Sequence, residues 1–282
     1  MGSSRLLLLL FFFYSILIHF VKPTIAQRDS TVLHNCYTTG NVTSNSTYRA
    51  NLNNLLSSLS SKTQMVNGFY NFSAGENSDK VNAIALCRAD LTSTDCRRCV
   101  NMSAHELLQL CPNQKEGIMW YMNCTVRYSD RFIFGSMESE PMRGLISSPT
   151  DSVKQFNREL NPLLDSLRYK AAGFSGKFAT GSNANNTNQN YTIYALLQCT
   201  PDLVDTLCQN CLTDAQIYIT QCCNDMRGAR VLTPSCNLRY ESSRFYGNTT
   251  QDEPPPGPPP SLSPPPPPPP STKGTRFPAH IF

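Results

Sequence analysis

Residues 87–99 read CRADLTSTDCRRC, and residues 199–211 read CTPDLVDTLCQNC. Both stretches contain the pattern C-x8-C-x2-C, and corresponding cysteines lie 112 positions apart. The register continues to a fourth and a fifth cysteine, so each copy reads C-x8-C-x2-C-x11-C-x12-C. The repeated cysteines are Cys87, Cys96, Cys99, Cys111 and Cys124, and Cys199, Cys208, Cys211, Cys223 and Cys236. Five cysteines that recur at one constant offset indicate two related domains, because composition alone would not produce this spacing.

The flanking residues repeat as well and define the domain limits. Arg127-Tyr128 corresponds to Arg239-Tyr240 at the same offset. We place domain 1 at residues 30–138 and domain 2 at residues 146–250, joined by a linker at residues 140–144. Each domain is large enough for a small hydrophobic core that disulfides would help to stabilise.

The two ends of the chain differ from the repeats in composition. Residues 1–26 read as a secretory signal peptide, with Arg5, a 16-residue apolar stretch from Leu6 to Val21 and small residues before a cleavage site after Ala26. Residues 252–282 form a Pro-rich tail with 13 prolines between residues 254 and 270. We expect this tail to be disordered and to favour polyproline II, because it has few backbone donors.

N-glycosylation occurs on secreted chains, so the eight N-x-S/T sequons of this chain are possible acceptor sites. We take seven of them as candidates for glycosylation. The eighth, at Asn123, contains Cys124 and is the poorest acceptor. The seven candidates are Asn41, Asn45, Asn71, Asn101, Asn185, Asn190 and Asn248.

The pattern of apolar residues predicts an α+β class for each domain. Leucines recur at helical spacing over residues 48–59 and again over residues 156–167, where Pro162 comes early. A second helix is expected from residue 92 or 93 to 110, with its counterpart beginning near residue 202. Alternating segments at 118–123 and 124–134, and at 231–237 and 238–246, predict antiparallel strand pairs. Helices on one face of an antiparallel sheet follow from this order.

The repeat also bears on how the cysteines pair. Six cysteines allow 15 pairings, so spacing alone does not assign them. Cys36 has no counterpart in domain 2, and Cys222 has none in domain 1. If Cys36 pairs with Cys111, its loss leaves Cys223 without a partner, and Cys222 appears beside it. This compensation favours Cys36–Cys111, and leaves Cys222 and Cys223 as a vicinal disulfide or as two free thiols.

Each repeat contains one CxxC motif, which would also suit a zinc site or a thioredoxin-like dithiol. Secretion favours oxidation, the two motifs are in different repeats, and neither has a thioredoxin-like context. We therefore expect structural disulfides, with no metal and no cofactor.

The two C-x8-C-x2-C motifs and residues 222–241, CCNDMRGARVLTPSCNLRYE, resemble the plant cysteine-rich repeat family, also called the ginkbilobin-homologous or stress-antifungal domain. Its members include secretory proteins, plasmodesmata-located proteins and ectodomains of cysteine-rich receptor-like kinases. The resemblance covers about residues 30–250. It implies that each domain has two helices packed on a five-stranded antiparallel sheet. It also implies the pairs Cys36–Cys111, Cys87–Cys96, Cys99–Cys124, Cys199–Cys208 and Cys211–Cys236, and it leaves Cys222–Cys223 as a vicinal disulfide or as two free thiols.

A single-domain antifungal member of the family is similar to lectins and binds mannose through an Asn, an Arg and a Glu. The resemblance transfers the last two roles to Arg230 and Glu241 in domain 2, which lacks the Asn. Domain 1 has Tyr37, Ile118 and Ser129 at the three positions, so it retains none. The alternative that we favour for Arg230 and Glu241 is a salt bridge that joins two strands.

Charge and motifs exclude several functional classes. Without Arg5 and Lys22 of the leader, the formal charge falls from +4 to +2, and no basic cluster provides a footprint for nucleic acid. No second long apolar run predicts a membrane span. No phosphate-binding loop or kinase motif is present, and no pattern points to catalytic residues. We therefore do not expect an enzyme.

The function we expect is that of a secreted protein of the apoplast or cell wall, which binds a carbohydrate or a partner protein in plant stress or defence signalling. A receptor-like kinase is one candidate partner. The alternatives are a mannose-binding antifungal lectin and a truncated or soluble form of a receptor-like kinase ectodomain. A partner site needs an exposed apolar patch, which Trp120, Tyr121, Phe132 and Phe134 would supply unless they pack in the core.

Overall fold

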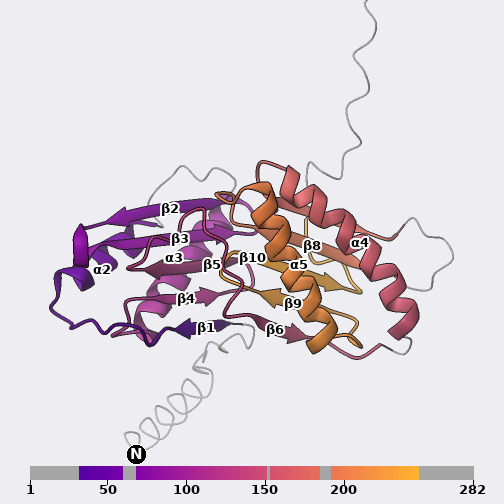
Figure 1. Cartoon of the computed structure of the whole chain (residues 1–282), viewed down its shortest axis with the longest axis horizontal. Helices are drawn as coiled ribbons and strands as arrows, with labels where there is room; N and C mark the ends of the chain where they lie inside the picture. The colour runs from indigo at the N-terminus through magenta and orange to yellow at the C-terminus, as the bar shows by residue number, and fades with distance from the viewer. Residues whose placement is uncertain (1–31, 60–67, 151–152, 185–191, 248–282) are drawn as a thin grey trace, which may run out of the picture.

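The structure is a computed structural model that describes residues 32–59, 68–150, 153–184 and 192–247. The expected leader, the Pro-rich tail and the sequons at Asn185, Asn190 and Asn248 lie outside the described residues. Two domains of the same topology lie next to each other along the long axis of the molecule (Figure 1).

Domain 1 has two α-helices and a five-stranded antiparallel sheet in the order β1-β4-β5-β3-β2. Its elements are β1 (Leu33–Cys36), α2 (Thr47–Leu59), β2 (Phe69–Ala74), β3 (Val81–Cys87), α3 (Ser93–Leu110), β4 (Gly117–Trp120) and β5 (Cys124–Ser129), with a short 3-10 helix at Asn77–Asp79.

Domain 2 repeats this arrangement in the strand order β6-β9-β10-β8-β7, which is also antiparallel throughout. Its elements are β6 (Arg143–Ile146), α4 (Val153–Gly173), β7 (Phe178–Ser182), β8 (Tyr194–Cys199), α5 (Asp205–Cys222), β9 (Ala229–Leu232) and β10 (Cys236–Glu241). The α+β class and the two-helix, five-stranded domain are therefore confirmed.

The helices form where the leucine spacing predicts them. Leu52 and Leu56 of α2 are fully buried against the sheet, and Leu160 and Leu164 do the same in α4. At the start of α3, Thr92 accepts a hydrogen bond from the backbone N–H of Asp95, which satisfies one of the free donors of the first turn.

Each sheet has one face covered by helices and one face without them. In β3, Ala83 and Ala85 belong to the core under the helices, and their small side chains let the helices approach closely. Ile84 and Leu86 point to the opposite face, which faces domain 2. Figure 1 shows α4 and α5 in front of the second sheet, whereas α2 and α3 lie behind the first. The helix-free faces can therefore contribute to the contact between the domains.

Six disulfides include all twelve cysteines. Three join α3 or its end to strands of domain 1, two do so for α5 in domain 2, and the sixth joins neighbouring residues at the end of α5. These are the pairs expected above: Cys36–Cys111, Cys87–Cys96, Cys99–Cys124, Cys199–Cys208, Cys211–Cys236 and Cys222–Cys223.

The repeated tyrosines have the same role in both domains. The hydroxyl of Tyr128 donates to the carbonyl of Gln114 at 3.1 Å, and that of Tyr240 donates to the carbonyl of Met226 at 3.3 Å. Each bond ties the central strand of the sheet to the loop that follows the second helix. This explains why the tyrosine recurs beside the last cysteine of each repeat.

Several element limits differ from the sequence prediction. Strand β6 includes Arg143 and Gly144, which lie in the segment that the sequence predicts as a linker. In domain 2 the turn between the paired strands lies at residues 233–235 rather than near residue 237. The reason is local, since Thr233 Oγ1 accepts hydrogen bonds from the N–H groups of Ser235 and Cys236. Pro162 lies near the middle of α4 and not early in it.

Candidate functional site

At the junction between the domains, a glycine of each domain donates a hydrogen bond to an aspartate of the other domain. The N–H of Gly135 donates to Asp202 at 2.8 Å, and the N–H of Gly247 donates to Asp90 at 3.0 Å. Gly135 and Gly247 are 112 positions apart, and so are Asp90 and Asp202. The junction is therefore close to two-fold symmetric, although it joins two halves of one chain.

The single tryptophan of the chain lies in this junction. Trp120 is fully buried, and its Nε1–H donates to the carbonyl of Thr233 in domain 2 at 3.0 Å. It forms a small apolar cluster with Ile118 and Leu232. Trp120 is thus not part of an exposed aromatic patch, because the other domain covers the face from which it projects.

The two residues predicted to bind carbohydrate both lie on the second sheet but do not form a pair. Arg230 is only 6% exposed, and its Nη2 donates to the carbonyl of Tyr121 in domain 1 at 2.8 Å. Burial, followed by the nearby charges of Arg239 and Arg88, lowers the pKa of Arg230 to about 9. Glu241 accepts two hydrogen bonds from Arg239, at 3.1 and 3.0 Å.

The salt bridge considered between Arg230 and Glu241 is therefore wrong. The register explains the outcome, since Arg239 is directly opposite Arg230 and Glu241 is opposite Tyr194. Glu241 binds the arginine of its own strand, whereas Arg230 binds the backbone of domain 1.

The three equivalent positions of domain 1 are covered as well. Ile118 and Ser129 are fully buried. The hydroxyl of Tyr37 is buried and has no hydrogen-bond partner among the described residues. Burial raises the pKa of Tyr37 to about 12, with smaller effects from the charged groups around it. These positions thus present no open set of polar groups to a sugar.

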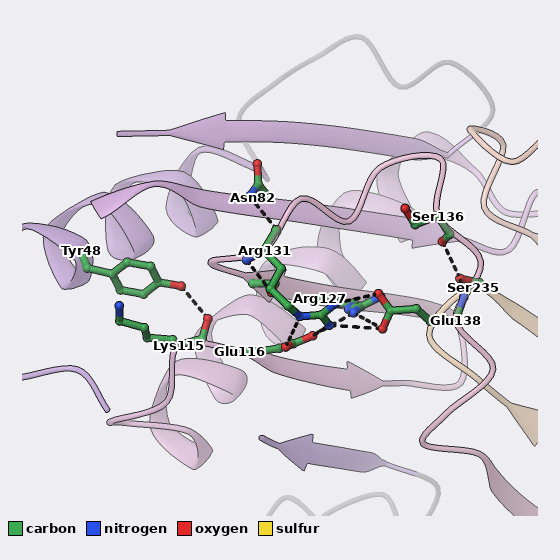
Figure 2. A network of polar contacts seen from close by, with 10 residues as sticks. Tyr48, Asn82, Lys115, Glu116, Arg127, Arg131, Ser136, Glu138 and Ser235 are labelled. Atoms are coloured by element: carbon green, nitrogen blue, oxygen red, sulfur yellow. Dashed lines mark hydrogen bonds and ion pairs between the residues drawn. The ribbon is translucent and has the colours of Figure 1, made fainter. Parts of the chain in front are cut away.

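Four charged side chains gather on the helix-free face of the first sheet (Figure 2). Arg127 projects from β5, and its Nη2 donates to Glu116 at 2.8 Å and to Glu138 at 2.6 Å. Arg131 follows β5, and its Nη2 donates to Glu116 at 2.7 Å and to Glu138 at 3.3 Å. Asn82 orients this loop by donating to the carbonyl of Arg131 at 2.7 Å.

The charges in this cluster support one another. Burial disfavours the charged form of Glu116, but hydrogen bonds from Arg131 and Arg127 outweigh this effect and lower the pKa of Glu116. Hydrogen bonding to Glu116 in turn raises the pKa of Arg131. With two arginines and two glutamates, the cluster is electrically balanced.

Glu138 connects this cluster to domain 2. Its backbone N–H donates to Ser235 Oγ at 2.9 Å, and the Ser235 hydroxyl in turn donates to the carbonyl of Ser136 (Figure 2). The amino-acid sequence alone does not predict this cluster. The repeated Arg127 gave one signal, but Glu138 lies in a polar segment between the domains with nothing to mark its role.

Beside the cluster lies the most exposed aromatic side chain of the four considered above. Phe132 is 67% exposed, and its ring meets that of Phe134 edge-on with centroids 5.2 Å apart. Tyr121 is half-buried, and its hydroxyl donates to Glu106. Of these four aromatic residues, Phe132 alone is exposed, whereas Tyr121 and Phe134 are half-buried and Trp120 is fully buried.

The described part of the chain offers little for metal or thiol chemistry. All twelve cysteines are in disulfides, so none is available as a thiolate. No group of three or more His, Cys, Asp or Glu side chains that could hold a metal ion occurs within residues 32–59, 68–150, 153–184 and 192–247. Within those ranges, no helix is both long enough and apolar enough to cross a bilayer.

Both domains match a known protein family, described as salt stress response/antifungal, over residues 35–131 and 146–243. The chain belongs to this family. It is 40% identical over 242 residues to cysteine-rich receptor-like protein kinase 25 of Arabidopsis thaliana, a match that covers 84% of this chain and 36% of the kinase. The chain thus spans about a third of the length of the receptor-like kinases that it matches.

Shorter relatives are matched over most of their length. Cysteine-rich repeat secretory protein 38 of Arabidopsis thaliana is 39% identical over 224 residues, with 77% of this chain and 86% of the relative covered. An antimicrobial ginkbilobin-2-like protein of Castanea crenata is 34% identical over 246 residues, with 86% and 97% covered. The relatives of this chain are therefore secretory proteins, antimicrobial proteins and receptor ectodomains.

A solved structure supports the tandem fold. The crystal structure of the tandem DUF26 ectodomain from the Arabidopsis thaliana cysteine-rich receptor-like protein PDLP8 superposes with a TM-score of 0.65 at 22% identity. The match covers 75% of this chain and 98% of that ectodomain. At this identity the likeness concerns the fold alone.

Proposed function

We propose that this protein is an extracellular recognition protein of plant stress or defence, which acts in the apoplast or cell wall by binding a partner protein and catalyses no reaction. Its secretory relative and its receptor ectodomain relatives support an extracellular role. The observation that carries the proposal is the exposed Phe132 next to the charge cluster at the domain junction.

The surface around Phe132 has the character of a protein-binding site. Arg131 is 52% exposed, but its guanidinium group is held by Glu116 and Glu138. Phe132 is supported by the edge of the Phe134 ring. Aromatic and arginine side chains that are already held in place lose little conformational entropy when a partner covers them, and such residues dominate binding energy at interfaces.

The proposal can be tested by capturing partners from plant wall extract with three versions of the secreted protein. Wild type and Tyr169→Ala should capture the same proteins, whereas Phe132→Ala should lose at least one of them. Tyr169 is a suitable control because it is an exposed aromatic residue, 60% accessible, on α4. Identical capture by all three versions would remove Phe132 from the proposed site.

A mannose-binding antifungal lectin is the second candidate, favoured by the similarity to the antimicrobial protein of Castanea crenata. This function would require Arg230 and Glu241 to reach one sugar. Arg230 is occupied by domain 1, so we expect no mannose signal from the intact protein on a glycan array. A mannose signal that disappears in Arg230→Ala would instead favour the lectin.

A third alternative is a soluble or truncated form of a receptor-like kinase ectodomain. It is supported by the match of 84% of this chain to a receptor-like kinase. A receptor-like kinase is also a candidate partner, because related ectodomains occur on such receptors. Sequencing of transcripts across the codon for Lys273 would separate a dedicated secreted protein from a shortened receptor.

A further inference from the structure

A small cavity lies between the two domains next to the charge cluster. Its volume is about 10 Å³, which is the space that one water molecule needs. Thr125 and Arg127 line it from domain 1, and Thr200, Ser235 and Asn237 line it from domain 2. Most of these polar side chains are more than nine-tenths buried, so the cavity is part of the packed junction.

One atom of Arg127 in this region lacks a partner. The Arg127 side chain is 2% exposed, and its Nη2 binds both glutamates of the cluster. Its Nε–H is buried and has no acceptor among the described residues. An unpaired donor on a buried guanidinium group is costly, and native proteins usually satisfy such a group with protein or with ordered water.

The chemistry of the cavity identifies the kind of ligand. Glu116 and Glu138 already balance the charges of Arg127 and Arg131, so the residues around the cavity carry no net charge that would favour an anion or a cation. The other polar lining groups are hydroxyls and an amide, which offer both donors and acceptors, while Ile84, Leu86, Pro234 and Cys236 complete the lining. A neutral ligand of one heavy atom that both donates and accepts fits this set.

We propose that one ordered water molecule occupies the cavity, accepts a hydrogen bond from Arg127 Nε in domain 1 and donates to the polar groups of domain 2. The water completes the hydrogen bonding of the charge cluster and joins the domains at a point where no direct bond from Nε reaches across. It adds to the direct bonds made by Trp120 and Arg230. This inference does not depend on the proposed function.

A crystal structure of the mature secreted protein at about 1.5 Å resolution would test the proposal. We expect a well-ordered water peak at hydrogen-bonding distance from Arg127 Nε, about 2.7–3.2 Å away, with a second contact to domain 2. The same water should give a nuclear Overhauser effect to the Arg127 Nε–H in solution. A cavity without density, a heavier ion in it, or an Nε–H bonded to a protein acceptor would overturn the proposal.

Discussion

Removal of the Cys36–Cys111 disulfide should destabilise the protein far more than removal of the Cys222–Cys223 disulfide. The two form a matched pair, because Cys111 and Cys223 occupy the same place after the second helix of each repeat, and both are fully buried. The two disulfides differ in the length of the loop that they close, because the sequence separation is 75 for Cys36–Cys111 and 1 for Cys222–Cys223.

The expected magnitude follows from the entropy of the unfolded chain. In the loop-closure model, a cross-link over 75 residues stabilises the fold by about 4 kcal/mol, whereas one between neighbours contributes roughly 0.6 kcal/mol. Replacing both members of each pair by alanine removes the same atoms in the two variants. Cys111 and Cys223 are at equivalent buried sites, and Cys36 and Cys222, although not equivalent, are both half-buried, so the cavity costs should be similar. The variants should therefore differ by about 3–4 kcal/mol in the free energy of unfolding.

Equilibrium unfolding in guanidinium chloride would measure this difference. Trp120 is the only tryptophan and is fully buried at the junction, so its fluorescence reports on domain 1 and on the domain contact together. Circular dichroism on the same samples would show whether both domains unfold in one transition. Equal losses in the two variants, or a larger loss in Cys222→Ala/Cys223→Ala, would refute the argument from loop entropy.

Three further changes have expected outcomes. Trp120→Phe removes the hydrogen-bond donor to Thr233 but keeps an aromatic ring, so it should lower the free energy of unfolding by about 1 kcal/mol. Urea unfolding followed by circular dichroism would measure this loss, and unchanged stability would contradict a role for that bond. Because the pKa of Glu116 is lowered from 4.5, its charge stabilises the fold above about pH 4.5, and this contribution fades as the pH falls further. Glu116→Gln should thus be less stable at pH 7 yet lose less stability on acidification to pH 3.5, and parallel thermal-unfolding curves of both proteins would count against this. Asn71 is exposed in β2, so Asn71→Gln should lower the intact mass of the secreted protein by one glycan; no such decrease would show that the site is unused.

The sequence predicts the helices better than the central strands, for a physical reason. Helix α2 has a water-facing side and a buried side, so its leucines stand out at helical spacing. Strand β3 is buried on both faces, one under helices and the other towards domain 2, and residues 81–87 therefore show no alternation. A strand of this kind looks like any short apolar run until its neighbours are known.

Prediction of the candidate site reaches a similar limit. The sequence gives Trp120 and Phe132 as members of one possible patch, but it does not reveal which face another domain covers. Arg230 likewise carries no sign that its partner is a backbone carbonyl more than 100 residues away, at Tyr121. The repeat does contain one useful indication. Gly135 corresponds to Gly247 and Asp90 to Asp202, and in the structure each glycine donates a hydrogen bond to the aspartate of the other domain.

The near-symmetry of the junction bears on which surface would serve the proposed partner binding. Equivalent residues that keep the same role, such as Tyr128 and Tyr240, maintain the fold in both domains. For the proposed recognition role, a surface specific to one partner would use features that only one domain provides. Phe132 meets this condition, since the equivalent position in domain 2 is Arg244, whose guanidinium group lies 5.2 Å from the centre of the Tyr246 ring. The exposed ring of domain 1 therefore has no counterpart, and a single partner would recognise the molecule in one orientation.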